Sequence, residues 1–269
     1  MKPHEEFRKV IEKVFFKSKS TRASRYISYI VGNSIVMLLI FYVLLDEAVL
    51  DWTGSLHPIG SGISLAINGL DTAIPFIPQM AIFYVYIFGS MIILTMLYFA
   101  FREYKNGYAV GWSFVFIEVI AAVLYIILPV SVYQYHEQLL ATPVGMNWWI
   151  AEVHNIVSDF GSPFNTFPSL HAAGSTVCVY TWHQHSKLHS SHLNRVLAAL
   201  SVIASVGIIL STLFLKQHYV LDEVSGVILG WGVSRIVFNH LWNRSEQLKL
   251  LSKSEAPRIQ KVKPEHDLS

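Results

Sequence analysis

A histidine and an aspartate four residues apart stand out in the C-terminal half of the chain. His218 and Asp222 follow a short segment that ends in Lys216-Gln217. Residues four apart share one face of a helix, so the carboxylate can reach one ring nitrogen of the imidazole. A carboxylate that holds one nitrogen protonated leaves the other nitrogen available as a base or a nucleophile. The pair therefore predicts nucleophilic chemistry, with Lys216 as a nearby cation.

A second candidate segment begins at Asn165 and reads Asn-Thr-Phe-Pro-Ser-Leu-His-Ala. Proline is favoured in the first turn of a helix, so we expect a helix to begin here with Asn165 or Thr166 as its N-cap. The free amides near Ser169, Leu170 and His171 would then lie at the positive end of the helix dipole. That arrangement predicts an anion-binding site.

Membrane-spanning helices are the elements that must position these residues. Of the 269 residues, 53% are hydrophobic and only 14% are charged, whereas about a quarter are charged in an average soluble domain. A crossing helix needs about 20 largely apolar residues, and six stretches come near that length. They are residues 26–45, 79–101, 108–130, 168–182, 194–215 and 219–241. The predicted fold class is an all-α, polytopic membrane protein with six transmembrane helices.

The positions of the Lys and Arg residues predict the orientation of these helices. Eight basic residues precede the first predicted helix and six follow the last, whereas the connections 46–78 and 131–167 contain none. Short cytoplasmic connections collect Lys and Arg. We therefore expect an integral protein of the plasma (inner) membrane with both termini in the cytoplasm. Both long connections, and the candidate site with them, are expected on the outer face.

The chain is expected to divide into three regions. Residues 1–25 place apolar residues at helical spacing between basic ones, which predicts a cytoplasmic amphipathic helix or, alternatively, a solvated basic leader. Residues 26–244 form the six-helix catalytic domain, and residues 245–269 form a polar cytoplasmic tail. Within the first long connection, residues 56–78 are too polar to span but carry apolar side chains, which predicts an interfacial segment.

Taken together, the two candidate segments resemble signatures of the type 2 phosphatidic acid phosphatase superfamily. Its second signature is Pro-Ser-Gly-His, and here Pro-Ser-Leu-His ends at His171. Its third is Ser-Arg, five residues, His, three residues, Asp, and here Ser211, His218 and Asp222 match. The resemblance implies that His218 is the nucleophile, that Asp222 orients it and that His171 protonates the leaving oxygen. Ser169 would bind the phosphate.

Two departures from the family pattern concern phosphate charge. Thr212 replaces the arginine of the third signature, and the first signature, a Lys, six residues and Arg-Pro, is absent. Leu170 replaces the usual glycine, and these changes resemble the branch of inositol phosphorylceramide synthases and their bacterial relatives. Lys216, the helix N-terminus and a bound cation are the candidates for neutralising the phosphate. The predicted substrate-binding residues are Ser169, Leu170, Lys216, Ser211 and Thr212.

The predicted function is hydrolysis of a membrane lipid phosphate or diphosphate at the outer leaflet through a phosphohistidine. The alternative is a lipid phosphotransferase, in which an alcohol headgroup replaces water. A channel or transporter lined by Glu118, Arg235 and Asp222 is a third reading, but it does not explain why the two signatures occur together. We expect the lipid bilayer and a lipid phosphate as partners, no redox cofactor, and no nucleic acid because the net charge is only +2.

Cysteine and histidine usage bears on metal sites. The single cysteine, Cys178, excludes an intramolecular disulfide and a cysteine metal cluster. Four histidines gather around the connection between the fourth and fifth predicted helices: His183, His185, His189 and His192. That connection contains no matching carboxylate, so the sequence predicts no metal site.

Overall fold

The computed structural model describes residues 62–143, 147–159 and 164–259, together with residues 44, 48, 55 and 56. Over these residues the regular elements are seven α-helices, a 3₁₀-helix and a π-helix, and extended segments meet only in isolated bridges. The predicted all-α class is confirmed. The first predicted span and the amphipathic N-terminal helix lie outside the described residues.

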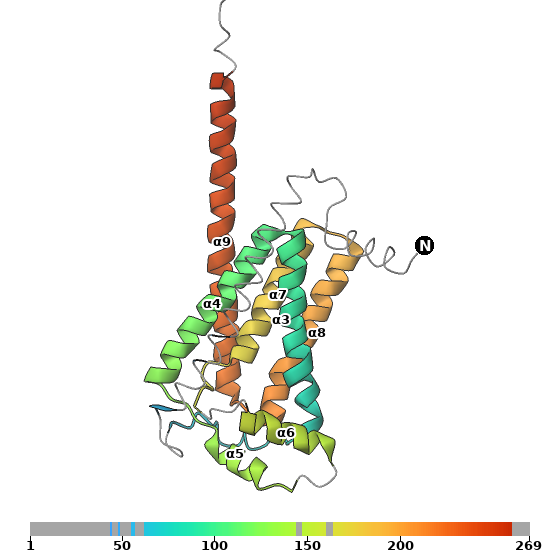
Figure 1. The fold of residues 1–269 in the computed structure, drawn as a ribbon, viewed down its shortest axis with the longest axis vertical. Helices are drawn as coiled ribbons and strands as arrows, with labels where there is room; N and C mark the ends of the chain where they lie inside the picture. Colours follow the sequence, from blue (N-terminus) through green and yellow to red (C-terminus); the bar gives the residue numbers. More distant parts are fainter. Residues whose placement is uncertain are drawn as a thin grey trace, which may run out of the picture.

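Five long helices run side by side and form the core of the molecule (Figure 1). They are α3 (Phe88–Arg102), α4 (Tyr104–Ile127), α7 (Leu170–Leu188), α8 (His192–Phe214) and α9 (Val220–Ile259). The 3₁₀-helix η1 (Pro78–Met80) and the π-helix η2 (Ile82–Ile87) lead into α3. Helix α7 packs against each of the other four long helices, so it is the central element of the bundle.

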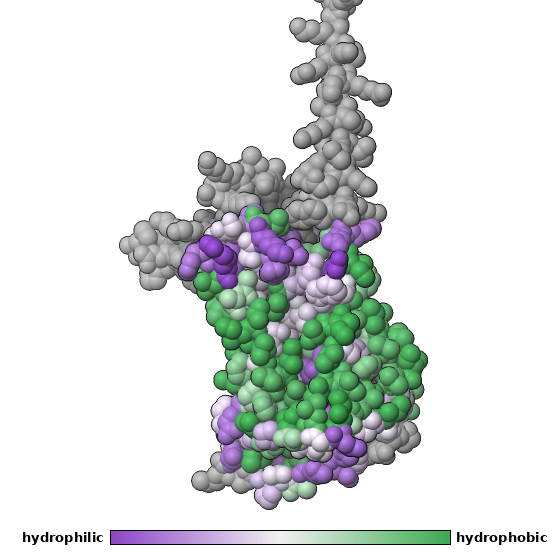
Figure 2. All heavy atoms as spheres, turned by 180° about the vertical axis from the view of Figure 1, so that it is seen from behind, coloured by the Kyte–Doolittle hydropathy of each residue, from purple (hydrophilic) through white to green (hydrophobic). Residues whose placement is uncertain are grey.

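Among the described residues, three helical segments are long and apolar enough to cross a membrane: Pro78–Ala100, Asn106–Ile127 and His192–Phe214. They agree with the second, third and fifth predicted spans and indicate a membrane protein. Figure 2 shows a hydrophobic belt between two hydrophilic ends. Large apolar side chains such as Leu94, Ile203 and Ile236 are exposed, as expected for a bundle whose surroundings are lipid.

The fourth and sixth predicted spans are also helices, α7 and α9, but they are less apolar. Helix α7 carries His171, His183 and His185, and α9 begins with Asp222 and Glu223 in its first turn. Because α7 is surrounded by four other helices, it does not need an apolar outer face. Six membrane crossings therefore remain a prediction.

The two ends of the bundle differ. At one end, which we call the capped end, α5 (Tyr133–Leu140), α6 (Trp148–Asp159) and the irregular segment 62–77 cover the helix termini (Figure 1). At the other, the turn end, α3 turns into α4 and α7 into α8. The described parts of the two connections that lack basic residues thus lie at the same end. Which end faces outward stays a prediction.

Helices α7 and α9 cross closely at two glycines of α9. A Cβ atom added to Gly226 would overlap the carbonyl oxygen of Ser169, and one added to Gly230 would overlap that of Ala173. Small residues four apart let two helix backbones approach each other in this way. The backbone N–H of Ser169 donates to the carbonyl of Asp222 at 3.0 Å. This crossing brings the two signature segments together.

Candidate active site

The rings of His171 and His218 lie edge to face at the capped end, with centroids 5.9 Å apart and planes inclined by 63°. His171 is in the first turn of α7, and His218 is in the turn between α8 and α9. The His171 ring packs against Tyr84, at 4.2 Å between centroids, and Phe88, at 4.5 Å. The two predicted histidines are therefore brought together, and aromatic contacts fix the plane of one of them.

The hydrogen bond that orients His218 comes from a backbone carbonyl. Its Nδ1 lies 2.9 Å from the carbonyl oxygen of Thr166 and 3.7 Å from Oδ2 of Asp222. A carbonyl only accepts, so Nδ1 carries the proton, and in the neutral ring Nε2 has the lone pair. A separation of 3.7 Å is too long for a hydrogen bond. Asp222 thus acts on the ring as a nearby charge, while Thr166 sets its orientation.

Asp222 is completely buried at the start of α9. Its Oδ2 accepts from the backbone N–H of Tyr219 at 2.8 Å, and within the described part of the chain Oδ1 has no hydrogen-bond partner. A carboxylate in the first turn of a helix is stabilised by the helix dipole. The sequence predicted the spacing of this pair, and the additional role of Asp222 in ordering the first turn is new.

The surroundings of His218 favour a positive charge on its ring. Burial lowers the pKa of the imidazole, but the Asp222 carboxylate, the Thr166 carbonyl and, when it is ionised, the Glu223 carboxylate raise it above its ordinary value. A histidine that bonds to phosphorus through Nε2 also becomes positively charged. The Asp222 carboxylate and the Thr166 carbonyl would therefore stabilise a phosphohistidine at this position.

The start of α7 differs from the prediction. Its N-cap is Ser169, whose Oγ accepts from the backbone N–H of Ala172 at 3.2 Å. Neither Asn165 nor Thr166 is the cap, so that expectation is wrong. The Thr166 hydroxyl instead donates to the carbonyl of Val130 at 3.0 Å, and this bond holds in place the segment whose carbonyl orients His218.

The anion site expected at this helix start stays a prediction, to which the structure adds the position of two backbone amides. The amides of Leu170 and His171 are in the first turn of α7, where a helix offers them no internal acceptor. Ser169 is fully buried beside them. These groups lie on the same turn as the His171 ring, so a phosphate next to His171 would be within reach of two backbone donors.

A second buried carboxylate, which the sequence analysis did not identify, lies beside the predicted phosphate-binding residues. Glu223 is 3% exposed, and its Oε1 is 2.7 Å from the hydroxyl oxygen of Thr212. The Ser211 hydroxyl donates to the carbonyl of Ile208 at 2.6 Å. The Thr212 hydroxyl oxygen is also 2.6 Å from the carbonyl oxygen of Ile209. Because a hydroxyl has a single proton, both Thr212 contacts are favourable at once only when Glu223 is protonated.

Lys216 is held by the segment that covers the capped end. Its ammonium donates to the carbonyls of Asp71, at 2.9 Å, and Ile74, at 2.5 Å. Its backbone has a φ of +59°, in the left-handed region that disfavours residues other than glycine. The Asp71 carboxylate in turn accepts from the backbone N–H of Val220 at 2.9 Å. Lys216 and Asp71 thus fasten residues 71–74 to the start of α9.

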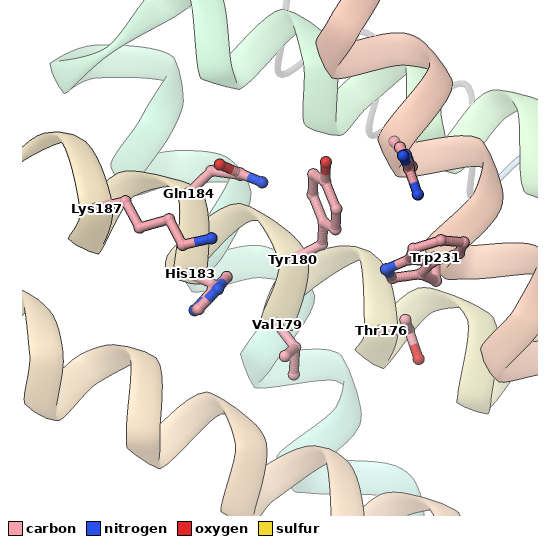
Figure 3. Close-up of a pocket in the computed structure, with 8 residues that line it drawn as sticks. Thr176, Val179, Tyr180, His183, Gln184, Lys187 and Trp231 are labelled. Atoms are coloured by element: carbon pink, nitrogen blue, oxygen red, sulfur yellow. The ribbon is translucent and has the colours of Figure 1, made fainter.

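A cavity of about 480 Å³ lies between α7 and α9, but none of the predicted site residues lines it. His183 and Lys187 enter it from α7, and Trp231 and Arg235 from α9 (Figure 3). The Arg235 guanidinium lies 5.1 Å from the centre of the Trp231 ring. This cavity is therefore separate from the pair of histidines at the capped end.

Comparison with known proteins gave one match. A family model described as the PAP2 superfamily matches residues 57–236, which include both signature segments and all the long helices except the last part of α9. Searches of curated proteins and of solved structures gave no significant match.

Proposed function

Since the chain belongs to the PAP2 superfamily, we propose that it is a membrane lipid phosphate or diphosphate phosphatase that works through a phosphohistidine. Membership of this superfamily suggests phosphatase or phosphotransferase activity, and the three apolar helices make a lipid substrate plausible. The observation that carries the proposal is the pairing of His171 and His218, whose ring centroids are 5.9 Å apart. Nδ1 of His218 donates to the Thr166 carbonyl, which leaves Nε2 of the neutral ring available for attack.

In the first step, Nε2 of His218 attacks the phosphorus atom of the substrate. A new N–P bond forms while the P–O bond to the leaving group breaks, and His171 gives its proton to the departing oxygen. Nδ1 of His218 keeps its proton, which it donates to the Thr166 carbonyl throughout. The positive charge that develops on His218 is balanced by Asp222, 3.7 Å away.

In the second step, a water molecule attacks the phosphohistidine. His171, neutral after the first step, takes a proton from the water as the new P–O bond forms and the N–P bond breaks. Inorganic phosphate leaves, and both histidines return to their starting protonation states. One histidine thus serves as acid and then as base, and the other only as nucleophile.

The phosphate oxygens would be bound by groups from both signature segments. We assign the amides of Leu170 and His171 and the Ser169 hydroxyl to this role, because they share the first turn of α7. Thr212 occupies the position of the arginine in the third signature, and its hydroxyl contacts the Glu223 side chain. A protonated Glu223 would donate its proton to the Thr212 hydroxyl and bring no negative charge to the phosphate. Ser211 and Lys216 would hold the end of α8 and the covering segment in place.

Transfer to an alcohol is the second candidate, and one observation favours it. His218 is only 8% exposed beneath the capped end, so water does not reach the phosphohistidine freely. An alcohol headgroup brought by a second lipid would then compete with water. Both reactions use the same intermediate, and the acceptor alone distinguishes them.

The test uses the purified full-length chain in lipid nanodiscs, presented with a panel of lipid monophosphates and diphosphates in ¹⁸O-labelled water. Release of phosphate that contains ¹⁸O supports hydrolysis. A new phosphodiester without free phosphate supports transfer. His218→Ala should abolish either product, whereas His192→Ala, a histidine of the turn end, should not. Turnover that survives in His218→Ala would refute the proposal.

A further inference from the structure

A cluster of two histidines and a glutamate lies at the turn end, away from the candidate active site. Glu103 follows α3, while His185 and His189 lie in the last turn and at the C-cap of α7. Oε2 of Glu103 is 3.1 Å from Nδ1 of His185, and its Oε1 is 2.6 Å from Nε2 of His189. Two imidazoles at the end of α7 thus converge on one carboxylate from the connection between α3 and α4.

The cluster has the donor set and spacing of a metal site. One ligand atom from each of the three residues lies within 4.8 Å of the other two. Histidines four apart on a helix present their rings on the same side. Two imidazole nitrogens and a carboxylate oxygen are ligands that zinc accepts, with a fourth position left for water.

Outer contacts orient the cluster in the way that metal ligands require. The side-chain amide of Asn106 donates to Oε2 of Glu103 at 2.8 Å, and the hydroxyl of Tyr98 is 3.3 Å from Nε2 of His185. When Nε2 of His185 donates to Tyr98, its Nδ1 lone pair faces the Glu103 carboxylate. Two acceptors 3.1 Å apart repel each other unless a cation lies between them.

The cluster also has a route for an ion to enter. His185 is 2% exposed and Glu103 15%, but the His189 side chain is 46% exposed. The buried pair forms the inner side of the site, and His189 forms its entrance. A surface pair of charged groups would lack this inner side.

We propose that Glu103, His185 and His189 bind a divalent transition-metal ion of the zinc class, which ties the connection between α3 and α4 to the end of α7. The sequence analysis predicted no metal because the connection that holds the histidines lacks a carboxylate. The carboxylate comes instead from Glu103, 82 residues before His185 in the chain. The site does not depend on the reaction proposed for the capped end.

Cobalt tests the proposal directly, because Co²⁺ bound by nitrogen and oxygen ligands absorbs visible light. The full-length chain, purified without a histidine tag, is titrated with CoCl₂ and then with ZnCl₂. We expect a visible band that saturates at one Co²⁺ per chain and disappears as Zn²⁺ displaces it. Zn²⁺ should also raise the Tm, because an ion that binds only the folded state stabilises it.

Three variants and a matched control decide which residues are ligands. His189→Ala removes an accessible ligand with little effect on packing, and Glu103→Gln keeps the shape of the side chain. Both should lose the band and the rise in Tm. Asn106→Ala should weaken Co²⁺ binding by about 10–100-fold, as loss of an outer-shell partner does. The control is His183→Ala, since His183 lines the cavity between α7 and α9 (Figure 3) and should leave binding unchanged.

Two results would overturn the proposal. The first is the absence of a saturable band in the unchanged protein. The second is equal binding in His189→Ala and in the unchanged protein. In either case the cluster is a proton-linked ion pair and not a metal site.

Discussion

The two ends of α7 use the same residue types in different ways. At the capped end, Nδ1 of His218 bonds to a backbone carbonyl, and the carboxylate of Asp222 stays 3.7 Å away while it accepts from a backbone amide. At the turn end, the carboxylate of Glu103 touches His185 and His189 at 3.1 and 2.6 Å.

From this difference we infer what would separate a nucleophile from a chelating cluster. A histidine that must attack needs one nitrogen occupied by an acceptor and the other unoccupied, and the capped end meets this need with the Thr166 carbonyl. Histidines that converge on one carboxylate direct their nitrogens to a common centre, as at the turn end. The predictions below test this contrast, beginning with the largest expected effect.

Loss of the nucleophile should have the largest effect. His218→Ala removes the only atom that we assign to bond formation with phosphorus, so phosphate release or transfer should fall to the background rate in a lipid phosphate assay. His185→Ala, at the turn end, should leave turnover within a few-fold of the unchanged protein. Equal losses in both variants would contradict the division of roles between the two ends.

His171→Ala should slow turnover by about 10²–10⁴-fold, the usual contribution of general acid catalysis. An activated aryl phosphate has a leaving oxygen that needs no proton. It should therefore restore much of the first step in His171→Ala and none of it in His218→Ala. Steady-state rates with alkyl and aryl substrates measure this difference. Identical rescue of the two variants would show that the acid and the nucleophile have been assigned wrongly.

The crossing of α7 and α9 provides a structural test. In Gly226→Ala the new Cβ atom overlaps the Ser169 carbonyl, so the signature segments must separate. Overpacking costs about 1–3 kcal/mol in unfolding free energy, and a shift of about 1 Å at a catalytic group can cost about 10²-fold in rate.

Gly232→Ala is the matched control, because nothing lies within 4 Å of the Cβ atom added there. It should retain activity and stability. Thermal unfolding and turnover measured for both variants separate the effect of the crossing from the general effect of replacing a glycine in α9. Full activity in Gly226→Ala would show that the crossing does not position the site.

Replacement of Lys216 should lower turnover less than the changes above, because its ammonium contacts the covering segment. Lys216→Met removes the hydrogen bonds to the Asp71 and Ile74 carbonyls, so the covering segment loosens and turnover should fall by about tenfold. The Tm should fall with it, and Lys216→Arg should recover part of both.

Lys187→Met, in the last turn of α7, is the matched control for the loss of a charge. If Lys216→Met lowers turnover without any change in Tm, the ammonium acts on the phosphate and not on the covering segment.

The pH dependence of kcat/KM should show the smallest effect. His218 attacks only when Nε2 is unprotonated, and its pKa in the folded protein is raised above its ordinary value of 6.5. For an activated aryl phosphate, whose departure needs no proton from His171, kcat/KM should therefore rise with pH through a value above 6.5. Asp222→Asn removes a neighbouring charge, so this limb should move to lower pH by about one unit. An unmoved limb would mean that Asp222 does not act on the charge of His218.

The same pKa shift links stability to pH. Because the pKa of His218 is higher in the folded state, its contribution to stability is complete below the unfolded pKa. It is lost as pH rises through the folded pKa. Denaturation in urea at several pH values measures it.

The local chemistry of the site could be predicted from the sequence because it depends on spacing. The spacing of four residues between His218 and Asp222 brings the two side chains close together, although His218 lies in the turn before α9 and not on the helix. The capping chemistry near Ser169 is readable from residue types. Even there, the residue types predict Asn165 or Thr166 as the N-cap of α7, whereas the N-cap in the structure is Ser169. The residue types of that segment allow several caps, and only the packing of Thr166 against Val130 and His218 excludes it.

Contacts between distant segments could not be predicted in this way. Glu103 meets His185 across 82 residues, and no local pattern connects them. Glu223 follows Asp222 directly, so the sequence does not tell which of two adjacent carboxylates faces the site. The pair Gly226 and Gly230 did carry a signal, since glycines four apart in an apolar helix predict a close crossing.

The formation of a phosphoryl bond on His218 tests the proposed chemistry most directly. An aryl phosphate is mixed with His171→Ala, whose first step needs no acid for this substrate and whose second step lacks its base, and the reaction is quenched and digested for mass spectrometry. We predict an acid-labile phosphoryl group on the peptide that contains His218. A phosphoryl group on another residue, or none during demonstrable turnover, would contradict the assignment of His218 as the nucleophile.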